Sequence, residues 1–132
     1  MGIVPYSPLG RGFLADFEAL STLSSTDFRA SHPRFTGENF EENKKRIARF
    51  YEIATKKNCT PAQLALAWLH SKGDDVFPIP GTKTSKRIEE NAGAFQFAPL
   101  SPEEMAEVET VVQLVGDRSH PASVNSNYNS RL

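Results

Sequence analysis

One stretch of the sequence gathers side chains that bind phosphate. It reads IPGTKTSKR over residues 79–87 and holds Lys83, Lys86 and Arg87 together with three hydroxyl side chains and a glycine. An apolar run precedes it and a helical pattern follows, which places it where a strand ends and a helix begins. Helix amino ends favour anions, whereas cations there oppose the helix dipole. The pattern favours a phosphate site over an exposed basic turn, because a bound anion removes that conflict.

A second stretch has the glycine spacing of a dinucleotide-binding turn. Residues 10–15 read GRGFLA, which fits G-x-G-x-x-A, and they follow a short apolar run that predicts a strand. A Rossmann fold also needs a second strand that ends in an acidic residue about 20 positions further on. Residues 21–37 are instead rich in serine and threonine, and Asp27 lies among them. The Rossmann interpretation is therefore disfavoured, and another type of phosphate loop is the stronger alternative.

The two stretches together suit a dinucleotide. Each follows a predicted strand, at 2–6 and at 76–80, and the alternation of strands and helices predicts parallel β/α units. Barrels of the (β/α)8 type place phosphate sites on the loops that follow strands 7 and 8. We expect the pyrophosphate of a dinucleotide at one of the two loops and its 2′-phosphate at the other.

Hydrophobic periodicity and capping residues predict the helices that hold these loops. The expected helical segments are 13–20, one that begins at Asn39, 60–73, 86–94 and 101–114. Capping boxes are predicted in the pairs Asn39–Glu42, Thr60–Gln63 and Ser101–Glu104. Residues 21–37 are expected to form a loop with one turn around 27–29. Phe13, Phe28 and Phe35 are expected to pack, with the lining of an apolar pocket as the alternative.

Composition narrows the class of protein. The chain has 132 residues with 15 basic and 16 acidic side chains, which gives a net charge of −1 and no field for nucleic acid or an anionic membrane. No apolar run approaches the roughly 18–20 residues of a membrane span. The lone Cys59 excludes an internal disulfide and fits a reducing compartment. The first residues lack the features of a signal peptide, so we expect one cytoplasmic domain.

Four motifs in order resemble one known enzyme family. They read YSPLGRGFL, PRFTGENFEEN, TPAQLALAWL and IPGTKTSKRIEEN, and they begin at residues 6, 33, 60 and 79. Together they resemble the carboxyl-terminal part of the aldo-keto reductases. The likeness is to the plant-type branch that includes perakine reductase and auxin-induced reductase-like proteins. It implies strands 7 and 8 of a (β/α)8 barrel over residues 1–115, followed by a polar tail over 116–132.

The resemblance also implies a cofactor, NADP(H), and a small carbonyl substrate. Family members reduce aldehydes and ketones to alcohols with NADPH. In the first loop, Tyr6 matches the aromatic residue that stacks on the nicotinamide. The pyrophosphate loop beside it matches Ser7, Pro8, Leu9 and Gly10, and continues through Arg11 and Gly12.

The second loop matches the adenosine end of the cofactor. The turn that holds the 2′-phosphate matches Gly81, Thr82 and Lys83. Arg87 matches the cation beside that phosphate, and the pair near the adenine matches Glu90 and Asn91. The spacing agrees with this, because residues three and four apart on a helix share a face.

Catalysis in the family depends on an Asp, a Tyr, a Lys and usually a His on earlier strands. Nothing in this sequence matches them, since Tyr51 lies on an apolar helix face, Tyr128 in the polar tail and His32 in a loop. We therefore expect no catalytic residue, no metal site, and a cofactor-binding part that is inactive alone. Two alternatives stay open. One is a non-catalytic nucleotide-binding or interaction module that associates with a full-length relative, and the other is a remnant of a truncated gene model.

Overall fold

Helices hold most of residues 1–117, the part of the chain that this computed structural model describes. The α-helices are α1 Phe17–Leu20, α2 Gly37–Lys56, α3 Pro61–His70, α4 Ser85–Ala92 and α5 Pro102–Val111. Short 3₁₀ turns are η1 Gly10–Gly12, η2 Phe28–Ser31, η3 Pro33–Phe35 and η4 Gly93–Phe97. The tail residues 118–132, with Tyr128, lie outside the described part.

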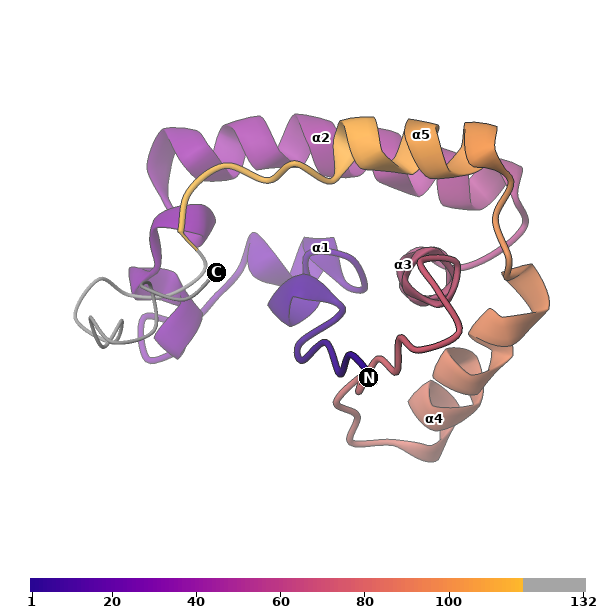
Figure 1. Ribbon diagram of the computed structural model, residues 1–132. Coiled ribbons are helices and arrows are strands. Elements are labelled where there is room, and N and C mark those ends of the chain that lie inside the picture. Colours follow the sequence, from indigo (N-terminus) through magenta and orange to yellow (C-terminus); the bar gives the residue numbers. More distant parts are fainter. Residues whose placement is uncertain (118–132) are drawn as a thin grey trace.

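The helices α2, α5, α3 and α4 form an arc around the amino-terminal segment (Figure 1). α2 and α5 lie side by side, and α3 contacts α2 on one side and α4 on the other. The amino-terminal segment, with α1 and η1, lies between α2 and the segment that leads into α4. This arrangement brings the loops after both predicted strands toward each other. None of the described helices is long and apolar enough to span a membrane.

The two predicted strands pair in parallel, but neither forms a continuous strand. Isolated parallel bridges join Ile3 to Val76 and Tyr6 to Ile79. Backbone bonds run from Ile3 N–H to the Asp75 carbonyl at 2.7 Å and from Phe77 N–H to the Ile3 carbonyl at 2.8 Å. The prediction of full strands at 2–6 and 76–80 is therefore wrong for this structure, and the (β/α)8 barrel stays a prediction.

Proline explains why the pairing stays so short. Pro5 lies in the first segment, and Pro78 and Pro80 lie in the second. Proline has no N–H to donate and tolerates ladder positions poorly. In addition, each segment has only the other as a neighbour among the described residues, and isolated two-stranded pairs are marginal in water.

The described residues leave much of this parallel pair uncovered. Five of its apolar side chains are more than half exposed: Ile3, Val4, Tyr6, Phe77 and Ile79. Large apolar patches of this kind are uncommon on monomeric proteins and mark contact surfaces. We call these five residues the open apolar face.

Local capping chemistry sets the amino ends of α3 and α5 as predicted. Thr60 Oγ1 accepts from the Gln63 N–H at 3.2 Å, and the Gln63 side chain accepts from the Thr60 N–H at 3.1 Å. Ser101 and Glu104 form the same reciprocal box at α5. However, α5 ends at Val111 and α3 at His70, earlier than the sequence pattern predicts.

The predicted cap of α2 is wrong. The helix begins at Gly37, after Thr36, and Thr36 makes no side-chain capping bond. Asn39 instead donates to the Pro33 carbonyl at 3.2 Å, and Glu42 pairs with Arg46 at 3.1 Å. Asn39 cannot cap α2 because it lies inside the first turn of the helix, and its side chain instead ties α2 to the preceding 3₁₀ turn.

Two apolar clusters hold the helices together. The larger lies between α2, α3 and α5 and has Phe50, Leu64 and Val108 at its centre, each at most 1% exposed. The smaller joins η1 and α1 to α2 and includes Phe13 and Phe35. These two phenylalanines pack as predicted, with ring centroids 4.7 Å apart. Packing of Phe13 therefore anchors the first predicted phosphate loop to α2.

Candidate functional site

The two predicted phosphate loops meet at one cavity of about 610 Å³. The predicted site residues that line it come from both loops: Ser7, Pro8, Leu9, Arg11, Gly12, Gly81, Lys83 and Arg87. Residues about 70 positions apart thus share one space because the segments that precede them pair in parallel. Sequence spacing indicated two anion sites, and the structure places the two loops at one cavity.

A smaller hollow of about 110 Å³ lies next to it. Glu90 and Asn91 line it, as do Leu9, Gly81 and Arg87, which also line the larger cavity. The helical spacing of Arg87, Glu90 and Asn91 predicted a shared face, and these three residues do line one hollow. The two spaces therefore form one region with a cationic part and an amide- and carboxylate-lined part.

Three predicted site residues lie apart from this region. Tyr6 and Gly10 line a separate groove of about 300 Å³ beside Trp68 and Leu69, which Ser7 and Pro8 also reach. The Tyr6 ring is 61% exposed, as part of the open apolar face. Thr82 lines none of these spaces, and its hydroxyl donates to the Thr84 carbonyl at 3.2 Å. Thr82 therefore shapes the turn before α4.

The first loop is wound tightly through left-handed backbone. Ser7 and Arg11 have φ of 50° and 57°, and Gly10 and Gly12 have φ of 60° and 108°. Residues other than glycine seldom adopt such angles. At Gly12, a Cβ would come within 3.3 Å of both the Arg29 guanidinium and the Leu20 side chain. Glycine is therefore needed at position 12 for its backbone angle and for the close packing around it.

An ion pair connects the two loops across the larger cavity. Asp16, which caps α1, has its Oδ2 3.7 Å from Nη2 of Arg87 in α4. Both side chains are more than half exposed, so water screens the pair strongly. Asp16 was not predicted as a site residue. It could have been found from the sequence as an acidic residue at the start of the helix that follows the first predicted phosphate loop.

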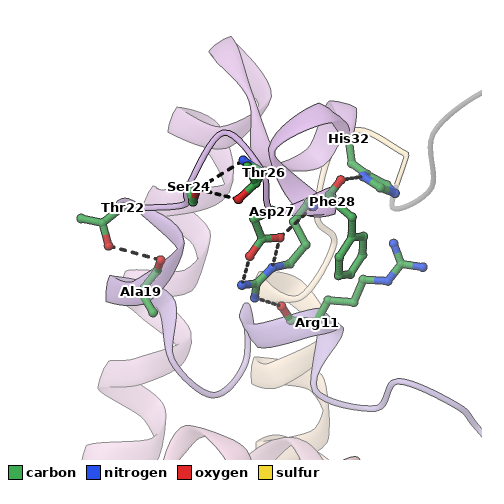
Figure 2. A network of polar contacts seen from close by, with 9 residues as sticks. Arg11, Ala19, Thr22, Ser24, Thr26, Asp27, Phe28 and His32 are labelled. Carbon is green, nitrogen blue, oxygen red and sulfur yellow. Dashed lines mark hydrogen bonds and ion pairs between the residues drawn. The ribbon is translucent and has the colours of Figure 1, made fainter.

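A second polar cluster lies behind the first loop (Figure 2). Arg29 Nε and Nη2 donate to the two Asp27 carboxylate oxygens at 3.0 and 2.7 Å, and Nη1 donates to the Arg11 carbonyl at 3.0 Å. The bonds from Arg29 lower the pKa of Asp27 to about 2, because they favour the charged carboxylate. This cluster joins the serine-rich loop to the phosphate loop, a contact that sequence spacing cannot reveal.

Phe28 completes the rim of the larger cavity. Its ring is 61% exposed and lines the cavity, and the Arg11 guanidinium carbon lies 5.5 Å from the ring centroid. The expectation that Phe28 packs in the core is therefore wrong. Its position on η2, whose amino end Asp27 caps, turns the ring outward beside Arg11 (Figure 2).

Tyr51, His32 and His70 make hydrogen bonds or ring contacts within the fold. The Tyr51 hydroxyl oxygen accepts from the Phe17 N–H at 3.1 Å, and burial raises its pKa. His32 Nδ1 donates to the Phe28 carbonyl at 2.7 Å. His70 stacks on Phe95 with centroids 4.2 Å apart, and burial lowers its pKa. Tyr51 therefore packs as predicted. In the described part of the chain no cluster of acidic, histidine and cysteine side chains could hold a metal.

Comparison with known proteins agrees with the resemblance in the motifs. The family model described as the aldo/keto reductase family matches residues 1–113. Among solved structures, the thermostable aldo-keto reductase Tm1743, crystallised with the inhibitor epalrestat, is 27% identical with a TM-score of 0.52. The match covers 84% of this chain and 30% of that one, so this chain spans less than a third of the solved protein's length. Because the family model matches most of the sequence, the chain belongs to the aldo/keto reductase family.

Proposed function

We propose that this chain is the NADP(H)-binding part of an oxidoreductase that reduces aldehydes or ketones to alcohols. Membership of the aldo/keto reductase family supports oxidoreductase chemistry. The observation that carries the cofactor proposal is the shared cavity, to which one loop contributes Arg11 and the other contributes Lys83 and Arg87. The three cations that the two loops bring to one cavity suit a ligand with several phosphate charges.

Each part of the two loops suits one part of a dinucleotide. Lys83 and Arg87 are the residues that would bind the 2′-phosphate, with Gly81 and Thr82 shaping the turn. The loop from Ser7 to Gly12 would follow the pyrophosphate. Glu90 and Asn91 would contact the adenine in the smaller hollow, and Tyr6 would stack on the nicotinamide. When bound, NADPH supplies the hydride for the carbonyl carbon.

This chain alone would bind the cofactor without turning over substrate. A general acid must lie within hydrogen-bond reach of the carbonyl oxygen that it protonates. Tyr51, which the sequence offers on a helix, instead holds α1 through the Phe17 N–H. The catalytic acid would therefore come from residues that correspond to earlier strands of a (β/α)8 barrel. In that barrel residues 1–115 would supply strands 7 and 8.

Two further properties belong to this proposal. The open apolar face would be covered by the remaining strands, or by a full-length relative in a non-catalytic complex. The lone Cys59 fits the reducing cytoplasm. The motifs favour the plant-type branch of the family.

Nucleotide titration of the purified chain tests the cofactor proposal. We expect Lys83→Ala to weaken NADPH binding by about tenfold or more, because a charge-assisted contact to phosphate is worth about 1.5–3 kcal/mol. NADH, which lacks the 2′-phosphate, should lose little. Lys86→Ala is the matched control, because Lys86 is in the same turn but does not line the cavity. Equal losses for NADPH and NADH would contradict the assignment of Lys83.

A further inference from the structure

The Arg29 guanidinium forms a bridge between two segments. Three of its nitrogens donate, two to the Asp27 carboxylate and one to the Arg11 carbonyl, at 2.7–3.0 Å. Only a quarter of the Arg29 side chain and 23% of that of Asp27 are exposed. A planar guanidinium is suited to this fork because its donors have fixed directions. Figure 2 shows the Asp27 carboxylate and the Arg11 carbonyl, the two groups that this guanidinium bonds.

The bonded carbonyl belongs to a residue in an uncommon conformation. Arg11 has φ of 57° and ψ of 33°, inside the 3₁₀ turn Gly10–Gly12. A non-glycine residue keeps such angles only where its surroundings hold it there. The bond from Arg29 Nη1 fixes the Arg11 carbonyl, and the Gly12 N–H bonds to the Leu9 carbonyl at 3.1 Å on the other side. The peptide after Arg11 is therefore held from two directions.

Fixing this backbone also places a charged side chain. The Arg11 side chain extends from this held backbone, and its guanidinium carbon lies 5.5 Å from the Phe28 ring centroid at the rim of the cavity. Phe28 itself is held by the same segment, because Asp27 caps η2 through the Arg29 N–H at 2.9 Å. The Asp27–Arg29 pair thus holds the backbone of both residues in the Arg11–Phe28 contact.

We propose that Arg29, held by Asp27, is a positioning residue that orients Arg11 toward the phosphates of the dinucleotide. The role rests on the proposed binding of NADP(H) in this cavity. Arg29 itself lines the cavity, but three of its five N–H donors already bond Asp27 and the Arg11 carbonyl, so we assign its effect to the Arg11 backbone. The serine-rich segment 21–36 therefore contributes to cofactor binding through its contact with the first loop.

A double-mutant cycle on the full 132-residue chain tests this role. NADPH affinity is measured by isothermal titration for Arg29→Met, Arg11→Met and the double variant. We expect Arg29→Met to weaken binding about tenfold, the size expected for one charge-assisted hydrogen bond. In the Arg11→Met background the same change should have almost no effect, because the residue that it positions is gone. A merely structural role would give the same loss in both backgrounds.

Milder variants and a charge control complete the design. Arg29→Lys keeps the charge but lacks the planar fork of donors that bonds both Asp27 oxygens and the Arg11 carbonyl, so it should also weaken binding. Asp27→Asn should give an intermediate loss. Arg49→Met removes an exposed arginine of α2 and should leave affinity unchanged. If the unaltered chain takes up no NADPH, the proposed function fails and this role fails with it. If the chain binds NADPH and Arg29→Met matches Arg49→Met, only the positioning role is overturned.

Discussion

Asp16 Oδ2 lies 3.7 Å from Arg87 Nη2, so a carboxylate occupies the cationic side of the cavity in which we place a phosphate. Asp16 caps α1 after the first loop, and Arg87 is in the first turn of α4 after the second. The contact therefore links both loops while it neutralises one of the cations that a phosphate would use. Its effect on binding depends on which of these two consequences is larger.

Removal of the Asp16 charge should strengthen NADPH binding. Asp16→Asn keeps a side-chain oxygen for the α1 cap but no longer competes for Arg87. We expect a gain of about two- to fivefold for NADPH, the range for an exposed charge pair, and little change for NADH. Titration with both nucleotides checks this. Glu18→Gln is the control, because it removes an exposed charge from the same helix. A weaker binding of NADPH would show that the link between loops is the larger effect.

The carboxyl group of Asp27, which holds Arg29 against the first loop, should titrate at an unusually low pH. Its pKa falls from an ordinary 3.8 to about 2, chiefly because of the side-chain hydrogen bond from Arg29. A lowered pKa in the folded state means that the stabilisation is complete above 3.8 and is lost as pH falls through about 2. A ¹³C titration of the Asp27 carboxyl by NMR should have its midpoint near the lower value. In Arg29→Met the midpoint should move up toward 3.8, and an unchanged midpoint would contradict the bonding described here.

Asn43 should be a major contributor to stability. It is fully buried on α2, its Oδ1 accepts from the Val115 N–H at 2.8 Å, and its Nδ2 donates to the Val115 carbonyl at 2.9 Å. Asn43→Ala leaves both backbone groups without this partner, so we expect a loss of about 2 kcal/mol in the free energy of unfolding. Urea denaturation followed by circular dichroism measures it. Asn39→Ala, which removes a single bond to the Pro33 carbonyl, should cost less than half as much.

The capping box of α3 should contribute more to the free energy of unfolding than the residue at the cap position of α2. Thr60→Ala removes a hydroxyl that accepts from the Gln63 N–H, and we expect a loss of about 1 kcal/mol. Thr36 occupies the equivalent position before α2 without a capping bond, so Thr36→Ala should cost little. Thermal unfolding of the two variants side by side gives the comparison. Equal shifts in Tm would show that threonine stabilises these positions in another way.

The sequence by itself determined features whose causes are local. The starts of α3 and α5 follow from capping boxes, because the donor and acceptor are three residues apart and need no other part of the chain. The cationic turn at 79–87 and the glycine spacing at 10–15 were also recognisable, because both are defined by residues that are close together in the sequence. Four motifs were sufficient to indicate the family.

Only the tertiary structure decided which distant groups meet. The parallel contact of 2–6 with 76–80 brings the loops after both segments to one cavity, and proline limits that contact to two bridges. Asn39 was predicted to cap α2, but the helix begins before it, and its side chain donates to the Pro33 carbonyl. The ion pair between Asp16 and Arg87 joins residues 71 positions apart. The bond from Arg29 to the Arg11 carbonyl joins residues 18 positions apart. Such pairs depend on how helices and loops pack, and sequence periodicity carries no information about contacts between separate elements.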